Sequence, residues 1–309
     1  MNARHRNRKL FLIILGLFVY ITIVHPAGQV QDWDMPYQRW DVPYVPTPYE
    51  IVDAMLEMAG VTETDTLFDL GCGDGRIVIT AARRLGTRGF GVDIDPERIE
   101  ECHSNASAAD VENLVTFLNQ DLFETDFSKA SVLTLYLLNS VNLRLRPKIL
   151  EELKPGTRVV SHDFSMGEWK ADQQADLMVD YRIHNVYFWV VPVNASGRWR
   201  VNKPAGLSSV PFTLNLEQKF QKIEGHVKIG NEVIRLKSAD LTADSIAFAF
   251  DRDTPDTAQT YTFEGGVKGH SMIGRLSIDS GTKRETFEFK AARDPKTKRP
   301  VDSEVGQDR

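Results

Sequence analysis

The chain has 309 residues, 42% of them hydrophobic and 26% charged, which is the balance of a globular protein long enough for two domains. Its 37 Lys and Arg residues against 43 Asp and Glu residues give a net charge of −6, which argues against nucleic-acid partners because nucleic-acid-binding surfaces are basic. Cys72 and Cys102 are the only cysteines, and no C-x-x-C motif or Cys/His cluster is present, so we expect neither a structural disulfide nor a metal site.

The amino terminus carries an apolar run over residues 10–24. Four basic residues precede this run: Arg4, Arg6, Arg8 and Lys9. The pattern predicts a signal anchor or a signal peptide over residues 1–28. The short run favours a signal peptide, whereas cleavage after Ala27 would leave His25 where a small residue is needed. A buried or amphipathic helix is the alternative.

The charges around this run predict its orientation in a membrane. Basic residues come before it, and Asp32, Asp34 and Asp41 come after it. The amino terminus is therefore expected inside, so that the protein is membrane-anchored with its body on the periplasmic or extracytoplasmic side.

The segment that follows is predicted to be a linker and then an α/β domain. Residues 29–48 are rich in Pro, Tyr and Trp, which favours an extended linker. Strand-like and helix-like segments then alternate over residues 49–191. Strands are expected at 66–70, 89–94, 114–118, 131–138 and 157–161, and helices between Pro48 and Gly60, at 77–85, after Pro96 and at 147–153. This alternation predicts a Rossmann-like, doubly wound and mainly parallel sheet.

The pattern changes after residue 191. Short segments with period-two alternation, such as Phe248 and Phe250, are punctuated by glycines. About eight strands are expected over residues 192–293, and they predict an all-β antiparallel barrel or sandwich domain. The charged residues 294–309 are expected to be disordered.

A glycine-rich loop at residues 69–76 links the first predicted strand to a helix. It reads D-x-G-x-G-x-G from Asp69 through Gly71, Gly73 and Gly75. Glycines of this kind let a ligand approach the backbone. A dinucleotide-binding G-x-G-x-x-G motif starting at Gly71 would need glycine where Arg76 stands. Asp69 can hold loop amides or a ligand amine, or it can cap a turn.

Asp93 ends the next predicted strand. An acidic residue there, about 20 residues past a glycine loop, is placed to accept hydrogen bonds from ribose hydroxyls. Asp95 directly precedes Pro96 and is better suited to cap a helix. We therefore assign the ribose contact to Asp93.

The loop order resembles motif I of the class I S-adenosylmethionine-dependent methyltransferases. Residues 45–48, which read Val-Pro-Thr-Pro, together with the loop and the strand ending at Asp93, are similar to bacterial and archaeal relatives of a mitochondrial lysine methyltransferase group. The resemblance implies an enzyme that binds S-adenosyl-L-methionine. It also implies that Asp121 contacts the adenine amino group while Leu122 and Phe123 cover the ring. A lysine acceptor follows only loosely.

The carboxyl ends of the later strands are where this family places the methyl acceptor. Residues 136–139 read Tyr-Leu-Leu-Asn, unlike the Asn-Pro-Pro-Tyr or Asp-Pro-Pro-Tyr of amide and adenine amino-methyltransferases, which disfavours those substrates. His162 and Asp163 follow the fifth strand, and either is a candidate catalytic base. A structural, hydrogen-bonded His162 is the alternative.

Two functions follow from these observations. The first is a membrane-tethered methyltransferase acting on a protein side chain or a small molecule. The second is an exported, non-catalytic protein whose barrel binds an apolar ligand or a partner; Gly197-Arg198-Trp199 resembles the G-x-W opening of lipocalin-like barrels. The cofactor is made in the cytosol, so an exported methyltransferase would lack an explained supply of it. Against the non-catalytic function, the three predicted cofactor contacts are intact.

Overall fold

The computed structural model describes residues 43–202, 212–253 and 257–302. The predicted amino-terminal signal segment and most of the predicted linker therefore lie outside the described residues. Within the described ranges, no helix is both long and apolar enough to cross a membrane.

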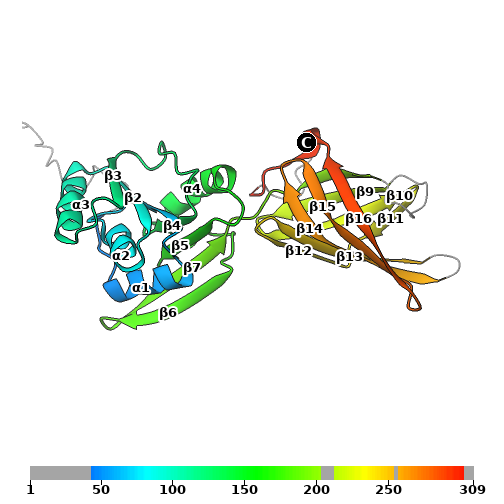
Figure 1. Cartoon of the computed structure of the whole chain (residues 1–309), viewed down its shortest axis with the longest axis horizontal. Helices are drawn as coiled ribbons and strands as arrows, with labels where there is room; N and C mark the ends of the chain where they lie inside the picture. The colour runs from blue at the N-terminus through cyan, green and yellow to red at the C-terminus, as the bar shows by residue number, and fades with distance from the viewer. Residues whose placement is uncertain (1–42, 203–211, 254–256, 303–309) are drawn as a thin grey trace, which may run out of the picture. The chain divides into compact units, whose positions relative to one another are not determined.

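The first sheet has seven strands in the order β3-β2-β1-β4-β5-β7-β6 (Figure 1). The strands are β1 Thr66–Leu70, β2 Arg88–Asp93, β3 Val115–Asn119, β4 Val132–Leu135, β5 Arg158–His162, β6 Gln173–Val179 and β7 Arg182–Val190. Strands β1 to β5 are parallel, and β7 pairs antiparallel with both β5 and β6. Because the sheet is mainly parallel, the carboxyl ends of β1 to β5 meet at one edge.

Four helices accompany this sheet: α1 Tyr49–Met58, α2 Arg76–Leu85, α3 Pro96–Ala108 and α4 Asn139–Glu152. Adjacent residues of β1 face opposite sides, since Leu67 joins a core built with α1, α2 and α3, whereas Phe68 joins a core that includes the buried side chains of α4. Helices thus cover both faces, and the predicted doubly wound α/β fold is confirmed.

Two predicted boundaries were wrong around α4. The apolar run 131–138 contains a strand of only four residues, and α4 begins at Asn139 rather than at Pro147, which lies inside the helix. Leu137 is buried although it lies outside β4. Its apolar character therefore reflects packing on the core and not strand structure.

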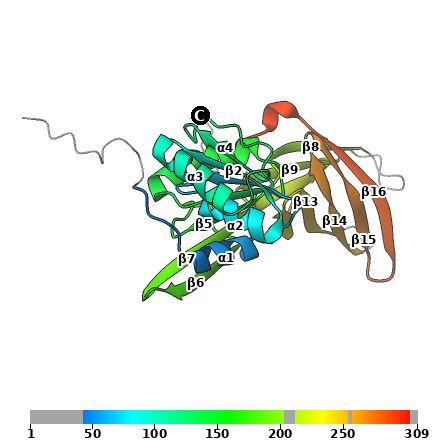
Figure 2. The same ribbon diagram turned by 60° about the vertical axis from the view of Figure 1, so that its left-hand side comes forward.

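The second sheet is antiparallel and has nine strands in the described residues, in the order β11-β10-β9-β8-β16-β15-β14-β13-β12. Figure 2 labels β8, β9 and β13 to β16 of this sheet. The strands are β8 Gly197–Asn202, β9 Phe212–Lys219, β10 Lys222–Ile229, β11 Glu232–Arg235, β12 Ser238–Thr242, β13 Ser245–Asp253, β14 Ala258–Lys268, β15 Ser271–Asp279 and β16 Arg284–Arg293. Only residues 236 and 237 join β11 to β12, so the two ends of the order must lie close together and the sheet is curled. The all-β prediction is confirmed, with one strand more than expected; the lipocalin likeness stays a prediction.

The tail that was expected to be disordered is structured as far as residue 302. Pro295–Thr297 forms a short 3-10 helix. The Asn194 side chain donates to the Arg299 carbonyl (2.7 Å), and the Phe220 amide donates to the carbonyl of the buried Val301 (2.7 Å). The disorder prediction rested on the charged composition of this segment. It failed because composition does not reveal the hydrogen bonds to the backbone carbonyls that hold the segment in place.

Candidate active site

The glycine loop lies between β1 and α2, at the carboxyl edge of the first sheet. Its amides at Gly71 and Cys72 donate to the Val92 carbonyl of β2 (2.8 and 3.0 Å). Gly71, Gly73 and Gly75 have positive φ values of 75°, 55° and 78°, which favour glycine. The backbone of the loop thus turns just before the amino terminus of α2.

Gly73 also lacks room for a side chain. A Cβ atom there would lie 2.5 Å from the ring of Tyr44, which belongs to the short described segment before α1. The guanidinium of Arg98 lies over the same ring, 4.7 Å from its centre. Residues before α1 therefore pack directly on the loop, a contact that the sequence signalled only through its Val-Pro-Thr-Pro segment.

Asp69 and Asp93 are both held close to the loop by hydrogen bonds. Asp69 is 2% exposed and accepts a hydrogen bond from Thr134 Oγ1 (2.7 Å). Its burial, with the nearby charges of Asp93 and Asp74, raises the pKa of this carboxyl to about 7. Asp93 accepts from the Gly73 amide (2.9 Å) and the Asp95 amide (3.0 Å), and burial raises its pKa as well. The structure thus places two predicted cofactor residues beside the predicted glycines.

A third carboxylate, Asp74, pairs with Arg76 on the same loop (2.6 Å). Burial opposes ionisation of Asp74, but the hydrogen bonds and charge of Arg76 outweigh it and lower the pKa of Asp74. Arg76 also donates to the Thr47 carbonyl (2.9 Å). Asp74 and Asp93, with Asp69 about half ionised at pH 7, leave an excess of negative charge over Arg76, which suits a ligand that carries positive charge, as the sulfonium and amino groups of S-adenosyl-L-methionine do.

Asp121 follows β3, next to the strand that ends in Asp93. Its carboxylate accepts a hydrogen bond from the Phe123 amide (2.8 Å), so it orders the turn that presents Leu122 and Phe123. Both apolar side chains are half-buried and pack against the core on the α4 side of the sheet. The adenine contact assigned to Asp121 and Leu122 stays a prediction.

The two cysteines, far apart in sequence, meet under the loop. Their sulfur atoms lie 3.8 Å apart as free thiols, and Cys102 Sγ donates to the Gly73 carbonyl (3.1 Å). The contact with Cys102 and burial raise the pKa of the Cys72 thiol. No disulfide is predicted from the sequence, and this contact between the two thiols was not foreseen.

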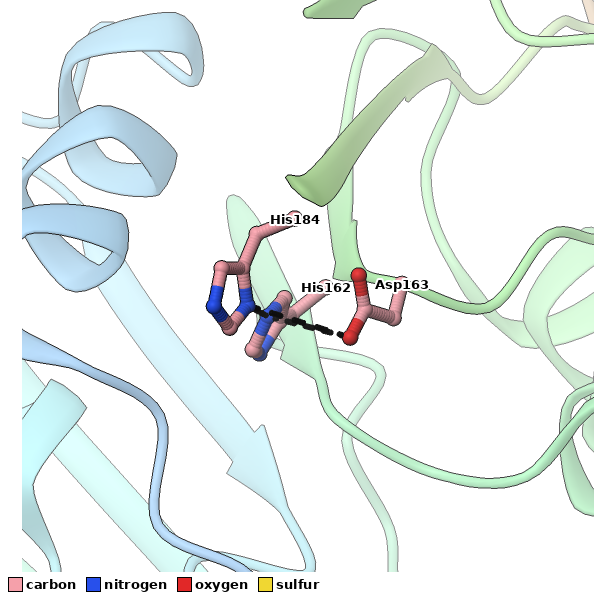
Figure 3. A group of neighbouring side chains, drawn as sticks. All are labelled: His162, Asp163 and His184. Atoms are coloured by element: carbon pink, nitrogen blue, oxygen red, sulfur yellow. Dashed lines mark hydrogen bonds and ion pairs between the residues drawn. The ribbon is translucent and has the colours of Figure 1, made fainter. Parts of the chain in front are cut away.

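A second polar cluster lies where β5 ends. His162 is fully buried, with Nδ1 at 3.1 Å from Thr47 Oγ1 and Nε2 at 2.8 Å from His184 Nδ1 (Figure 3). Tyr136, the residue after β4, stacks on its ring with 3.9 Å between ring centres. Burial lowers the pKa of His162 to about 4, so the ring is neutral at pH 7. A direct contact between His162 and an acceptor would require movement of its neighbours.

Asp163 completes this cluster. It has a positive φ of 59°, and its Oδ1 accepts from the Asn185 amide (2.9 Å) while its Oδ2 accepts from Arg182 (2.5 Å). Oδ2 lies 3.4 Å from His162 Nε2 and 3.9 Å from His184 Nδ1. The sequence analysis found no Cys/His cluster, because β7 brings His184 beside β5 only through antiparallel pairing.

Comparison with known proteins relates the part of the chain that forms the first sheet to methyltransferases. The ANTKMT methyltransferase domain matches residues 69–173. A Protein-lysine N-methyltransferase from Saccharolobus islandicus is 44% identical over 151 residues, which are 48% of this chain and 94% of that protein. The Adenine nucleotide translocase lysine N-methyltransferase of Mus musculus is 31% identical over 133 residues, 43% of this chain and 57% of its own length.

Solved structures also resemble this chain. One of them is the crystal structure of an RNA methyltransferase from Salinibacter ruber in complex with S-adenosyl-L-homocysteine, 55% identical, with a TM-score of 0.46 and covering 48% of this chain and 94% of that one.

Proposed function

Because this chain belongs to the S-adenosylmethionine-dependent methyltransferase family represented by the ANTKMT methyltransferase domain and the archaeal lysine methyltransferase, we propose that it methylates the side-chain amine of lysine in a protein. The chain is a class I methyltransferase, and S-adenosyl-L-methionine is its cofactor. The glycine loop with Asp69, Asp74 and Asp93 supports the part of this proposal that concerns the methyl donor. The names of the archaeal and murine relatives support lysine as the methyl acceptor.

The cofactor supplies a methyl group activated by a positively charged sulfur. The chain has to hold the acceptor amine in line with that methyl group and exclude water. Gly71 and Gly73 have no room for a side chain, since a Cβ would meet Leu137 at the first position and Tyr44 at the second. We expect Tyr136, which is half-buried and directly follows β4, to pack along the acceptor.

A lysine amine is protonated at neutral pH and must lose a proton before it attacks. His162 and Asp163 are the candidate bases at the acceptor edge. We expect His162→Asn to lower kcat at least about tenfold while the affinity for the cofactor stays close to that of the wild type. His103→Asn, at an exposed position of α3, is the control. A rate for His162→Asn within a few-fold of the wild type, measured by methyl transfer to the acceptor, would exclude His162 as the base.

The acceptor class is tested by labelling. Purified full-length protein is incubated with methyl-labelled cofactor and a lysate of cells that lack the protein. Label recovered as N-methyl-lysine in a protein band, and absent with Asp93→Ala, is the expected result. Label recovered in RNA or in small molecules would contradict the lysine proposal and leave the methyltransferase assignment in place.

We further propose that the chain is tethered to a membrane by its amino-terminal segment, with its body on the extracytoplasmic side. The support is the basic cluster before the apolar run at residues 10–24 and the acidic residues after it. Protease added to spheroplasts should digest the body if the orientation is right. Complete protection in spheroplasts, with digestion after lysis, would show that the body lies on the cytoplasmic side.

The alternative of a non-catalytic, ligand-binding protein is not favoured. The family match and the intact glycine loop both lie in the first sheet and support a methyltransferase. The curled second sheet has a core of its own, filled by side chains such as Phe248, Phe250 and Phe263. Such a core accounts for the alternating pattern by folding alone.

A further inference from the structure

We infer that His162 Nε2, His184 Nδ1 and Asp163 Oδ2 form a binding site for one divalent transition-metal ion of the Zn²⁺ class. The inference does not rest on the proposed acceptor, and a bound ion would occupy His162 Nε2 and Asp163 Oδ2, so that the metal role is an alternative to a base role for these two side chains. These three side chains converge at the end of β5 and the start of β7 (Figure 3).

The distances between the three donor atoms fit a metal ion. They are 2.8 Å between the two nitrogens, 3.4 Å from His162 to Asp163 and 3.9 Å from His184 to Asp163. A triangle with these sides has a circumradius of about 2.0 Å, so one point lies at zinc–ligand bonding distance from all three atoms. No backbone movement is needed to bring the donors to that distance.

The three donor atoms face one another, and a bound ion would replace the hydrogen bond between the two ring nitrogens and compete with Arg182 for Asp163 Oδ2. Thr47 Oγ1 occupies the other ring nitrogen of His162, and the Asn185 amide occupies the other carboxylate oxygen of Asp163. Metal-binding histidines in proteins commonly have their second nitrogen held in this way. The side chains of His162, His184 and Asp163 are 0%, 5% and 7% exposed, so a bound ion would be shielded from most of the solvent.

The donor types identify the class of ion. Two imidazoles and one carboxylate, with a fourth position for water, make a set that zinc accepts. Calcium and magnesium prefer oxygen donors and are disfavoured by the two nitrogens. One negative charge from Asp163 partly neutralises a divalent ion.

Arg182 opposes the ion. Its guanidinium binds the same oxygen, Oδ2, that would ligate the metal, while its side chain is 57% exposed. Metal binding therefore requires this ion pair to loosen. Removing the guanidinium should tighten metal binding, which is the reverse of the effect expected at a purely structural ion pair.

The test uses the full chain, stripped of metal with a chelator and titrated with Zn²⁺ by calorimetry. We expect one ion per chain, binding at least about tenfold weaker in Asp163→Asn and His184→Asn, and tighter in Arg182→Gln. His226→Asn, in β10 of the second sheet, should bind as the wild type does. Cofactor binding measured on each variant separates loss of the metal site from loss of the fold.

Co²⁺ provides a second readout on the wild type that needs no variant. Visible d–d absorption typical of a four-coordinate site with nitrogen and oxygen ligands is expected. A thiolate charge-transfer band would place the ion at Cys72 and Cys102 and overturn the assignment. Absence of saturable binding by the wild type, or wild-type affinity in both ligand variants, would also overturn it.

Discussion

At the scale of single residues, the ionisation of Asp69 couples folding to pH. Burial raises its pKa to about 7 in the folded chain, against about 3.9 when unfolded. The folded state therefore holds the proton more tightly, and this contribution to stability is full below about pH 4 and is lost as the pH rises to about 7. The loss amounts to about 4 kcal/mol because each pKa unit corresponds to about 1.4 kcal/mol.

Asp69→Asn should remove this pH dependence, since the amide does not titrate. Urea unfolding of the cofactor-free chain at about pH 5 and about pH 7.5 measures it. Between these two pH values the wild type should lose stability that the variant keeps. The free energy of unfolding of the variant, relative to that of the wild type, should therefore be higher at about pH 7.5 than at about pH 5. Equal differences at both pH values would show that Asp69 ionises normally in the fold.

Gly73 should tolerate no side chain, for two separate reasons. Its φ of +55° strains an L-residue, and a Cβ would lie 2.5 Å from the Tyr44 ring. Gly269 has nearly the same φ, +57°, with nothing within 4 Å of its Cβ position. Gly269→Ala should therefore cost only the strain, about 1–2 kcal/mol, and serves as the control.

Gly73→Ala should cost more stability than Gly269→Ala and should weaken cofactor binding at least about tenfold. Calorimetry with the cofactor and urea unfolding measure the two effects. Adding Tyr44→Ala to Gly73→Ala should recover part of the lost stability. Equal costs for the two glycine variants would mean that the Tyr44 ring moves aside freely.

At the scale of elements, the segment of residues 43–48 ties the glycine loop to the cluster after β5. The Thr47 carbonyl accepts from Arg76, and its hydroxyl contacts His162. Valine at position 47 keeps the shape and the carbonyl but leaves the buried His162 nitrogen without a partner. An unsatisfied buried polar group costs about 1–3 kcal/mol.

Thr47→Val should therefore destabilise the chain by that amount. The exposed Thr242 in β12 offers a matched control, and Thr242→Val should change the free energy of unfolding by less than about 0.5 kcal/mol. Urea unfolding compares the two variants. Equal effects would show that the hydroxyl at Thr47 contributes nothing to the folded state.

At the scale of the whole molecule, the predicted cofactor residues all belong to the first sheet and its loops. The match with the archaeal relative spans 151 residues and covers 94% of that protein. That relative therefore consists almost entirely of the part that corresponds to the first sheet of this chain. The second sheet buries a separate apolar core. We therefore expect a fragment of residues 43–191 to bind S-adenosyl-L-methionine with an affinity within a few-fold of the full chain.

Calorimetry on the fragment and on the full chain measures this expectation. Asp93→Ala in each background is the control, because Asp93 holds Gly73 in the loop and should be needed in both. A folded fragment that does not bind the cofactor would show that the second sheet contributes to the site.

Much of the fold could be predicted because its signals are local. Alternating strands and helices indicated the doubly wound sheet, and period-two alternation indicated the second, antiparallel sheet. The boundary at Asn139 was missed because an apolar residue such as Leu137 can be buried outside a strand. The segment around Val301 was missed because its order depends on hydrogen bonds to residues near 194 and 220.

The sequence by itself determined the order of elements that brings Asp69, the three loop glycines and Asp93 together, and with it the predicted donor site. Only the tertiary structure decided the surroundings of that site. Tyr44 covers Gly73, Thr47 contacts His162, and His184 reaches His162 through the pairing of β7 with β5. Such contacts join residues far apart in the chain, and they form only when the strands pair and the core packs.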